Sequence, residues 1–279
     1  MVYFPRVPTA GLVVFVHGGP GLHSEAERRT LGPLLDTAGV RVEFWNEPSS
    51  LRGAPAVSSG WFQRISASLR NSARAAEPLT LVAHSAGAHA ALQLLRERRH
   101  ADDAVVLIVP SLPLHGTLLR ILRLATVLYA PHAPELADRL SALAASSSRV
   151  MDPPLREALE LAVGAPELLR HYWGDDTAFA RFAAVLQEPE WGFDIEAFFS
   201  VLSELAAHEQ QVTATPLEHR STLIYGAQDP IFDASETLPQ VRRLLPAVTV
   251  DRFPGGHWPH LERPEEFVET LLRFESARC

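Results

Sequence analysis

The stretch LTLVAHSAG, residues 79–87, joins two different patterns at a single serine. The run LTLVA is almost continuously apolar, which is typical of a strand covered on both faces. The segment AGAHAALQLLRERR that follows repeats its apolar residues at helix spacing and ends on basic residues that suit the helix dipole. Ser85 is therefore predicted on a sharp turn between a strand and a helix, with the small residues Ala83 and Gly87 on either side. A serine held in this way forms a nucleophile elbow.

Five more short apolar runs repeat the strand pattern along the chain. They are GLVVFV (11–16), VRVEFW (40–45), AVVLIV (104–109), STLIY (221–225) and AVTVDRF (247–253). Helix-period segments alternate with them at 61–76, 235–245 and 264–277, and an earlier helix is predicted to begin with a capping box formed by Ser24 and Glu27. This alternation predicts an α/β fold with a doubly wound, mostly parallel sheet.

Residues 112–220 interrupt the alternation. They contain no clear strand, and prolines and glycines divide them into several helical segments. Both ends of this region return to the same sheet. We therefore predict a core formed by residues 1–111 and 221–279, with a helical cap, 112–220, inserted between two strands.

The composition excludes several classes of protein. The formal net charge of -8 argues against a nucleic-acid-binding surface. The single cysteine, Cys279, excludes an internal disulfide and a cysteine-based metal site. No apolar run is long enough to span a bilayer, and no targeting segment stands out. These features fit a cytoplasmic enzyme, monomeric or homodimeric, that acts on a small molecule and has no nucleic-acid or membrane partner.

Two further motifs supply an acid and a base for Ser85. In FPGGHWPHLERPEEF, His257 lies on a glycine-rich loop after the last predicted strand, and in LIYGAQDPIF, Asp229 follows the strand before it. Both come at the carboxyl ends of predicted parallel strands, where an open sheet builds its sites. The alternatives are His260 as the base and a turn-capping role for Asp229. We favour Asp229 as the acid, because no carboxylate follows the strand AVVLIV, and His257 as the base, because His260 precedes the proline-initiated helix and is expected to be structural. The resulting order, Ser, Asp, His, is the one expected for this elbow.

The motif HGGPG, residues 17–21, follows the first predicted strand. Its glycines leave backbone N–H groups free to approach a substrate oxygen. The N–H of Gly19, or that of Gly18, is expected to form an oxyanion hole with the N–H of Ala86. One such donor contributes about 3–4 kcal/mol of transition-state stabilisation.

Together, HGGPG, AHSAG, GAQDP and GGHWPHLERPEEF resemble the motifs of the α/β-hydrolase superfamily, in the same order and over almost the whole chain. The first motif in particular resembles the proline iminopeptidase branch. The chain departs from that branch at Ala86, where a tryptophan is usual, and at NEPSSLRG, where an Asp-Gln-Arg-Gly stretch is usual. The resemblance thus implies a serine hydrolase, and the departures speak against an aminopeptidase.

We predict a serine hydrolase that cleaves an ester or amide of a small, partly apolar substrate through an acyl-enzyme, with no cofactor and no metal site. Three alternatives stay open: a carbon–carbon bond hydrolase, a proline-iminopeptidase-like aminopeptidase, and a catalytically silent ligand receptor on the same fold. Trp191, Phe198 and His84 are candidates for the wall of the substrate pocket. Acidic side chains of the cap are candidates for binding a substrate ammonium group: Asp175, Asp176, Glu188 and Glu190.

Overall fold

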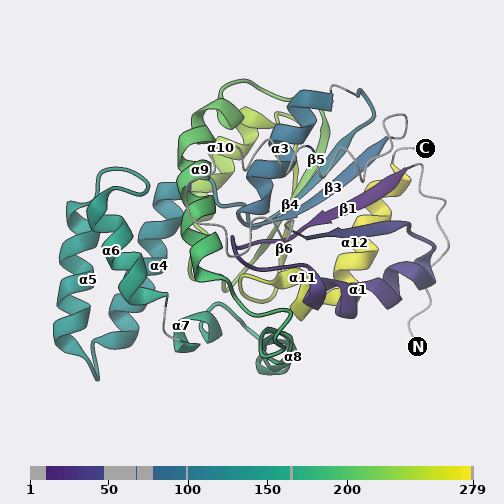
Figure 1. The fold of residues 1–279 in the computed structure, drawn as a ribbon. Helices are drawn as coiled ribbons and strands as arrows, with labels where there is room; N and C mark the ends of the chain where they lie inside the picture. The colour runs from purple at the N-terminus through teal and green to yellow at the C-terminus, as the bar shows by residue number, and fades with distance from the viewer. Residues whose placement is uncertain (1–10, 47–66, 68–77, 99, 164–165, 278–279) are drawn as a thin grey trace.

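The computed structural model describes residues 11–46, 67, 78–98, 100–163 and 166–277. Its six described strands form one sheet in the order β2-β1-β3-β4-β5-β6, and every neighbouring pair is parallel (Figure 1). The strands are β1 (Leu12–Val16), β2 (Val42–Trp45), β3 (Leu79–His84), β4 (Ala104–Ile108), β5 (Arg220–Gly226) and β6 (Thr249–Phe253). Each coincides with one of the apolar runs, so the predicted α/β sheet is confirmed.

The central strands of the sheet are more deeply buried than the two edge strands. Every residue of β1, β3 and β4 is buried, whereas β2 and β6 lie at the two edges and are partly exposed. The register pairs Val16 with Ala83, and Ile108 with both His84 and Ile224. The carboxyl ends of β1, β3, β4 and β5 are therefore level, and the segments that follow them meet at one edge of the sheet.

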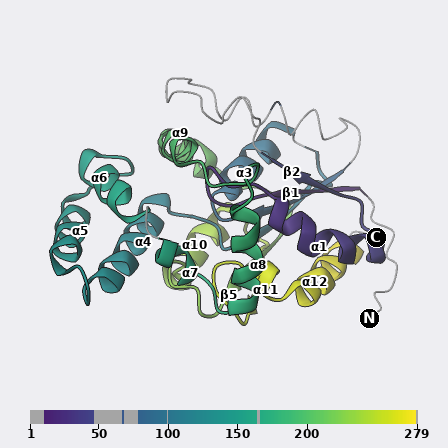
Figure 2. The same cartoon turned by 60° about the horizontal axis from the view of Figure 1, so that its bottom comes forward.

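Helices cover both faces of the sheet. They are α1 (Glu25–Ala38), α3 (Gly87–Arg98), α10 (Ala234–Leu244), the short α11 (Pro259–Glu262) and α12 (Pro264–Ser276). Helices α1 and α12 contact each other on one face, and α3 lies on the opposite face (Figure 2). The helix predicted at 61–76 lies outside the described residues, apart from Ala67.

The start of α1 differs from the prediction. Ser24 is its N-cap residue, but its side chain makes no capping hydrogen bond. Instead, its hydroxyl donates to the carbonyl of Trp45 at 2.6 Å, and the Glu27 carboxylate lies 3.4 Å from Nε2 of His260. The predicted capping box is therefore wrong, because both side chains find tertiary partners in the buried region where α1 begins.

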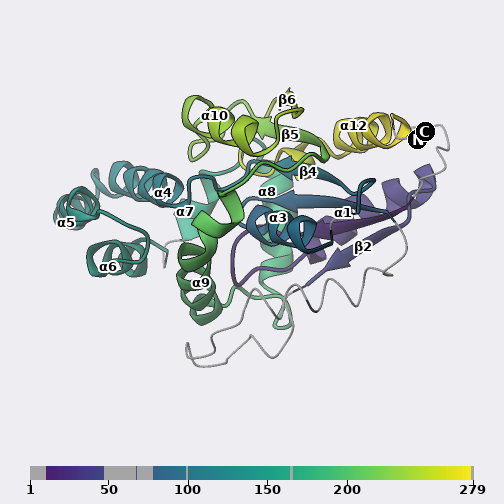
Figure 3. The same ribbon diagram turned by 90° about the horizontal axis from the view of Figure 1, so that it is seen from above.

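Six described helices lie between β4 and β5, and we refer to residues 114–213 as the helical segment. They are α4 (Leu114–Tyr129), α5 (Pro134–Ser146), α6 (Pro153–Ala162), α7 (Pro166–Arg170), α8 (Asp176–Leu186) and α9 (Ile195–Thr213). Aspartates at 152, 175 and 194 cap α6, α8 and α9. Figures 1 and 3 show α4, α5 and α6 to one side of the sheet, with α9 beside α3. Within the described residues, no helix combines the length and apolar character needed to cross a bilayer.

Candidate active site

The turn after β3 holds Ser85 in a strained conformation. Its φ is 49°, and its N–H donates to the carbonyl of Ile108 at 2.8 Å, which fixes the turn to the end of the neighbouring strand. The next turn of backbone leaves no room for a side chain at Gly87, where a Cβ would lie 2.4 Å from the carbonyl oxygen of His17. The glycine in the sequence motif is thus required by the close approach of two loops. A non-glycine residue at positive φ is typical of a functional site.

Ser85, His257 and Asp229 form a continuous chain of hydrogen-bond distances. Oγ of Ser85 lies 3.0 Å from Nε2 of His257, and Nδ1 of His257 lies 2.7 Å from Oδ2 of Asp229. The other carboxylate oxygen of Asp229 accepts from the N–H groups of Ile231 and Phe232 at 2.9 and 3.1 Å. Asp229 therefore caps its own turn and contacts the imidazole with separate oxygens, so the two roles considered for it in the sequence are compatible.

Backbone contacts fix the loop that carries His257. The N–H of His257 donates to the carbonyl of Tyr172, which follows α7, at 2.6 Å. The carboxylate of Glu262 accepts from the N–H groups of Gly256 and Gly174 at 2.8 and 3.0 Å. Burial raises the pKa of Glu262 despite these two donors. Glu262 thus links the histidine loop to the helical segment, directly beside the imidazole.

The glycine loop presents backbone N–H groups to Ser85. Gly19 has a φ of 62°, and the N–H groups of Gly19 and Ala86 have no hydrogen-bond acceptor among the described residues. The N–H of Gly18 likewise has no acceptor among the described residues, but a Cβ on Gly18 would lie 2.2 Å from Nδ1 of His84. Gly19 and Ala86 both line the cavity described below, and Gly18 does not. The geometry therefore favours Gly19 over Gly18 as the donor on this loop.

His84 and His260 are buried beneath the site. Nε2 of His84 donates to the carbonyl of His257 at 2.8 Å, and burial, reinforced by neighbouring histidines, keeps the pKa of His84 well below its usual value. Burial also lowers the pKa of His260, whose ring lies 4.8 Å from that of His84. Ligand atoms of Glu27, His84 and His260 lie within 4.8 Å of one another. Because Nε2 of His84 donates to a backbone carbonyl, only its Nδ1 can accept, and that nitrogen has no hydrogen-bond partner among the described residues.

A cavity of about 360 Å³ opens at Ser85. The loops contribute Ser85, Ala86, Gly19, His257 and Ser111, and the helical segment contributes mostly apolar walls: Leu114, Leu118, Ile121, Leu168, Leu169, Tyr172, Leu186, Phe198 and Leu202. No aspartate, glutamate, lysine or arginine is among the described residues that line it. The cavity therefore suits an uncharged, apolar group next to the serine.

The predicted pocket residues divide into two groups. Phe198 and His84 line the cavity, but Trp191 does not. The Trp191 ring packs 4.8 Å from the ring of His23, and its carbonyl accepts a hydrogen bond from Nε2 of His23. Trp191 therefore packs outside this cavity: it follows α8, and its ring and carbonyl contact His23, which follows the glycine motif.

The acidic side chains of the helical segment also lie outside the cavity. Asp175 caps α8 through the N–H groups of Thr177 and Ala178, and Asp176 forms an ion pair with Arg170. Glu188 forms an ion pair with Arg29. Most of these acids therefore stabilise the helical segment or fix it to α1, and none faces Ser85.

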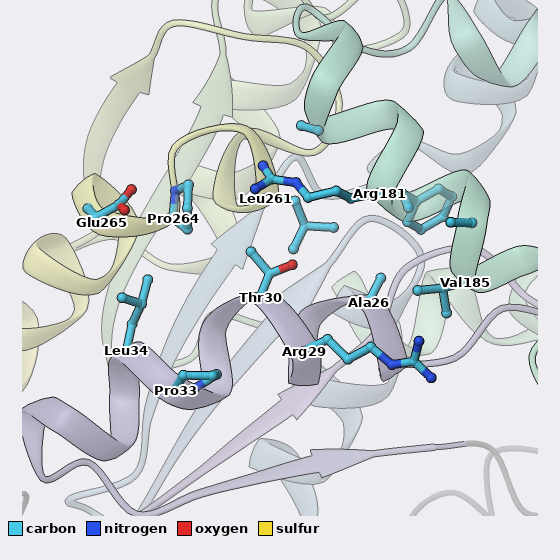
Figure 4. A pocket seen from close by; sticks show the side chains of 13 residues that line it. Ala26, Arg29, Thr30, Pro33, Leu34, Arg181, Val185, Leu261, Pro264 and Glu265 are labelled. Atoms are coloured by element: carbon cyan, nitrogen blue, oxygen red, sulfur yellow. The ribbon is translucent and has the colours of Figure 1, made fainter. Parts of the chain in front are cut away.

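A second cavity, of about 490 Å³, lies between α1 and α8 (Figure 4). Its labelled side chains include Arg29, Arg181 and Glu265, which surround an apolar floor formed by residues such as Leu261. None of the residues of the Ser85 site lines it. Arg29 is already paired with Glu25 and Glu188, and the described residues that line this cavity include no serine, cysteine or histidine.

Two residues at the site were not singled out from the sequence: Ser111 and Glu262. Glu262 lies within the quoted GGHWPHLERPEEF motif, a few residues after Gly256, to which it is hydrogen-bonded. A carboxylate so close in sequence to the glycine-rich loop could have been considered as its acceptor. Ser111 follows the strand AVVLIV, where the sequence shows no carboxylate. Its hydroxyl lies 3.0 Å from Oγ of Ser85. Tyr172 is one of the aromatic residues of the helical segment, and it lines the cavity, but its backbone contact with His257 depends on the path of that segment.

The fold corresponds to that of a known family. The model of the Alpha/beta hydrolase family matches residues 13–270, and the chain belongs to that family. Among solved structures it is similar to a proline iminopeptidase-related protein from Thermus thermophilus, with 20% identity and a TM-score of 0.66, covering 97% of this chain and 91% of that one. The resemblance inferred from the sequence motifs is therefore confirmed at the level of the family.

Two further structures extend the comparison. A thermophilic esterase from Thermogutta terrifontis has 17% identity and a TM-score of 0.60, covering 97% of this chain and 91% of that one. A monoacylglycerol lipase from Paleococcus ferrophilus has 17% identity and a TM-score of 0.57, covering 99% of this chain and 97% of that one. At these identities the likeness shows a shared fold.

Proposed function

We propose that this chain is a serine hydrolase that cleaves an ester, or an activated amide, of a small and uncharged apolar acid. Ser85 attacks the carbonyl carbon while Nε2 of His257 takes its proton, and the same nitrogen then protonates the leaving group. Asp229 holds the imidazole in the tautomer that leaves Nε2 free to accept. The N–H groups of Gly19 and Ala86 bind the oxyanion, and water frees the acyl-enzyme by the reverse steps.

The observation that carries this proposal is the chain of contacts from Ser85 through His257 to Asp229, at 3.0 and 2.7 Å, beside two backbone N–H groups that have no acceptor among the described residues. A serine hydroxyl is a weak nucleophile unless a base is within hydrogen-bond reach. A silent ligand receptor has no use for this alignment, so the geometry favours an enzyme.

The lining of the cavity supports an esterase over an aminopeptidase. An aminopeptidase must bind a substrate ammonium group, which requires a carboxylate or a set of acceptors in the pocket. The described residues that line the cavity include no carboxylate, and the acids considered from the sequence lie elsewhere.

The experiment is a panel of three substrate classes: p-nitrophenyl esters, amino-acid p-nitroanilides and vinylogous diketones. We expect the esters to be hydrolysed with the highest kcat/KM, and hydrolysis to be lost in the Ser85→Ala variant. Faster cleavage of proline anilide would establish the aminopeptidase, and faster cleavage of a diketone would establish the carbon–carbon hydrolase. Inactivity towards all three classes would favour the receptor.

A further inference from the structure

The hydroxyl of Ser111 is built into the site as a second partner of the nucleophile. Its Oγ lies 3.0 Å from Oγ of Ser85, and Ser111 is buried and lines the cavity. Its N–H donates to the carbonyl of Ser85 at 3.2 Å, and its own carbonyl accepts from Nε2 of His89 at 3.0 Å. Burial lowers the pKa of His89 to about 4, so this ring is neutral and has one N–H to donate. Three contacts therefore hold Ser111 against the elbow.

Counting protons fixes the direction of the bond between the two hydroxyls. Oδ2 of Asp229 is an acceptor, so Nδ1 of the neutral His257 ring carries the proton and Nε2 accepts. The single proton of the Ser85 hydroxyl then points to Nε2 of His257. Ser85 has no second proton to donate, and Ser111 must therefore donate to Oγ of Ser85.

We propose that Ser111 is a further catalytic residue, which donates a hydrogen bond to Oγ of Ser85 whenever that oxygen gains negative charge. This inference rests on the proposed serine hydrolase function. In acylation, the O–H bond of Ser85 breaks, its proton passes to Nε2 of His257, and a bond forms between Oγ and the carbonyl carbon. One lone pair of Oγ attacks, and the other continues to accept from Ser111.

In deacylation, Oγ of Ser85 also gains negative charge, this time as the leaving group. Water gives a proton to Nε2 of His257 and its oxygen bonds to the acyl carbon. The bond from that carbon to Oγ of Ser85 then breaks, and Oγ takes the proton back from His257. Because Oγ is the departing oxygen, a donor placed on it lowers the barrier to this step as well. Ser111 should therefore affect both half-reactions by similar factors and substrate binding very little.

The test compares four variants: Ser111→Ala, Ser111→Thr, Ser111→Cys and, as a matched control, Ser221→Ala. Ser221 is also a buried serine, but it lies near the start of β5, does not line the cavity, and its hydroxyl has no hydrogen-bond partner among the described residues. The readouts are the rate of phosphonylation of Ser85 by a fluorophosphonate, and the acylation and deacylation rate constants from stopped-flow bursts with a p-nitrophenyl ester.

We expect Ser111→Ala to slow phosphonylation, acylation and deacylation, each about tenfold, as loss of one neutral hydrogen bond implies. Ser111→Thr keeps a hydroxyl and should stay near the wild-type rates. Ser111→Cys should fall between the alanine and threonine variants, and Ser221→Ala should leave all three rates unchanged. If Ser111→Ala fails to fold, the test is whether Ser111→Cys reacts more slowly than Ser111→Thr.

Wild-type or faster rates in Ser111→Ala would overturn the inference. Unchanged rates would mean that the Ser111 hydroxyl does not affect the reaction, and faster rates would mean that its hydrogen bond makes Oγ of Ser85 less nucleophilic. Slowing confined to one half-reaction would also overturn it. The failure of the proposed function is a separate outcome: in that case Ser85 itself is not phosphonylated, or Ser85→Ala keeps its activity.

Discussion

The loops at the carboxyl ends of the strands and the helical segment meet at one cavity, but different forces hold them. In the loops, glycines let backbones approach closely, as at Gly87, and short hydrogen bonds fix Ser85, His257 and Asp229. In the helical segment, aspartates cap the N-termini of three helices, and apolar side chains line the cavity. Ion pairs such as Arg139–Glu157 lie at the surface.

This difference separates reactivity from selectivity. The loop positions depend on backbone geometry at a few points, so small changes there should abolish the reaction. The walls of the helical segment depend mainly on side-chain size, so changes there should alter which substrate fits. Substitutions in the two regions can therefore be compared directly, and the expected effects differ by orders of magnitude.

The largest effect is expected for Ser85→Ala. Removal of the attacking oxygen should lower kcat for the best ester by at least about a thousandfold, the scale seen when a triad residue is removed. The melting temperature should change little, because only one hydroxyl is lost at a turn that already contains small residues. Steady-state kinetics and a thermal melt check both parts; activity within tenfold of the wild type would show that Ser85 is not the nucleophile.

The two histidines of the GGHWPHLERPEEF motif should separate the base from a structural residue. His257→Ala should lower kcat/KM by a factor of about a thousand, since it removes the proton acceptor. His260→Ala should mainly lower stability, by about 1–3 kcal/mol, because the buried Glu27 carboxylate loses a partner. Measuring kcat/KM and chemical unfolding for both variants provides the check; greater inactivation by His260→Ala in a folded protein would reverse the assignment.

In the helical segment, Phe198→Ala should change selectivity, while the matched Trp191→Ala should not. Phe198 lines the cavity and Trp191 packs on His23 outside it. Loss of one aromatic wall shifts the preference between acyl groups by about 1–3 kcal/mol. The measurement is the ratio of kcat/KM for octanoyl and acetyl p-nitrophenyl esters. Equal ratios in wild type and Phe198→Ala, or a larger change in Trp191→Ala, would place the acyl pocket elsewhere.

The smallest effect is expected at Asp152, the cap of α6. Burial alone would raise its pKa, but the N–H groups of Ser148 and Leu155 and the hydroxyl of Ser147 hold that pKa below its usual value. The resulting stabilisation is present above the unfolded-state pKa and is lost as the pH falls through the folded-state pKa. Asp152→Ala should cost about 1 kcal/mol at neutral pH without changing kcat.

Urea unfolding of the wild type and Asp152→Ala at neutral and acidic pH measures this cost. The difference between the two proteins should shrink as the pH is lowered. A difference that grows in acid, or a loss of activity in the neutral-pH assay, would mean that this end of the helical segment is coupled to the site in a way that its capping role does not explain.

Periodicity and motif order were sufficient to predict the sheet. All six described strands coincide with apolar runs. Helices cover both faces of the sheet, and buried strands contain few polar residues. The close approach of Ser85, Asp229 and His257 was also expected from their positions after parallel strands. The catalytic roles themselves remain predictions until the variants are measured.

The sequence failed where a contact depends on the path of the chain between distant segments. Ser24 and Glu27 have capping-box spacing, yet tertiary partners take both side chains. Trp191 belongs to an aromatic cluster, and only the turn after α8 decides that it faces His23. Ser111 carried no signal as a lone serine after a strand, because its importance comes from the neighbouring elbow.

The central claim is that Ser85 is a nucleophile activated by His257. The most direct measurement is reaction with a fluorophosphonate, followed by peptide mapping of the adduct by mass spectrometry, in wild type, Ser85→Ala and His257→Ala. We predict a single adduct on Ser85 in the wild type, none in Ser85→Ala, and labelling slowed at least about a hundredfold in His257→Ala. An adduct on another residue, or equal labelling rates in wild type and His257→Ala, would contradict the claim.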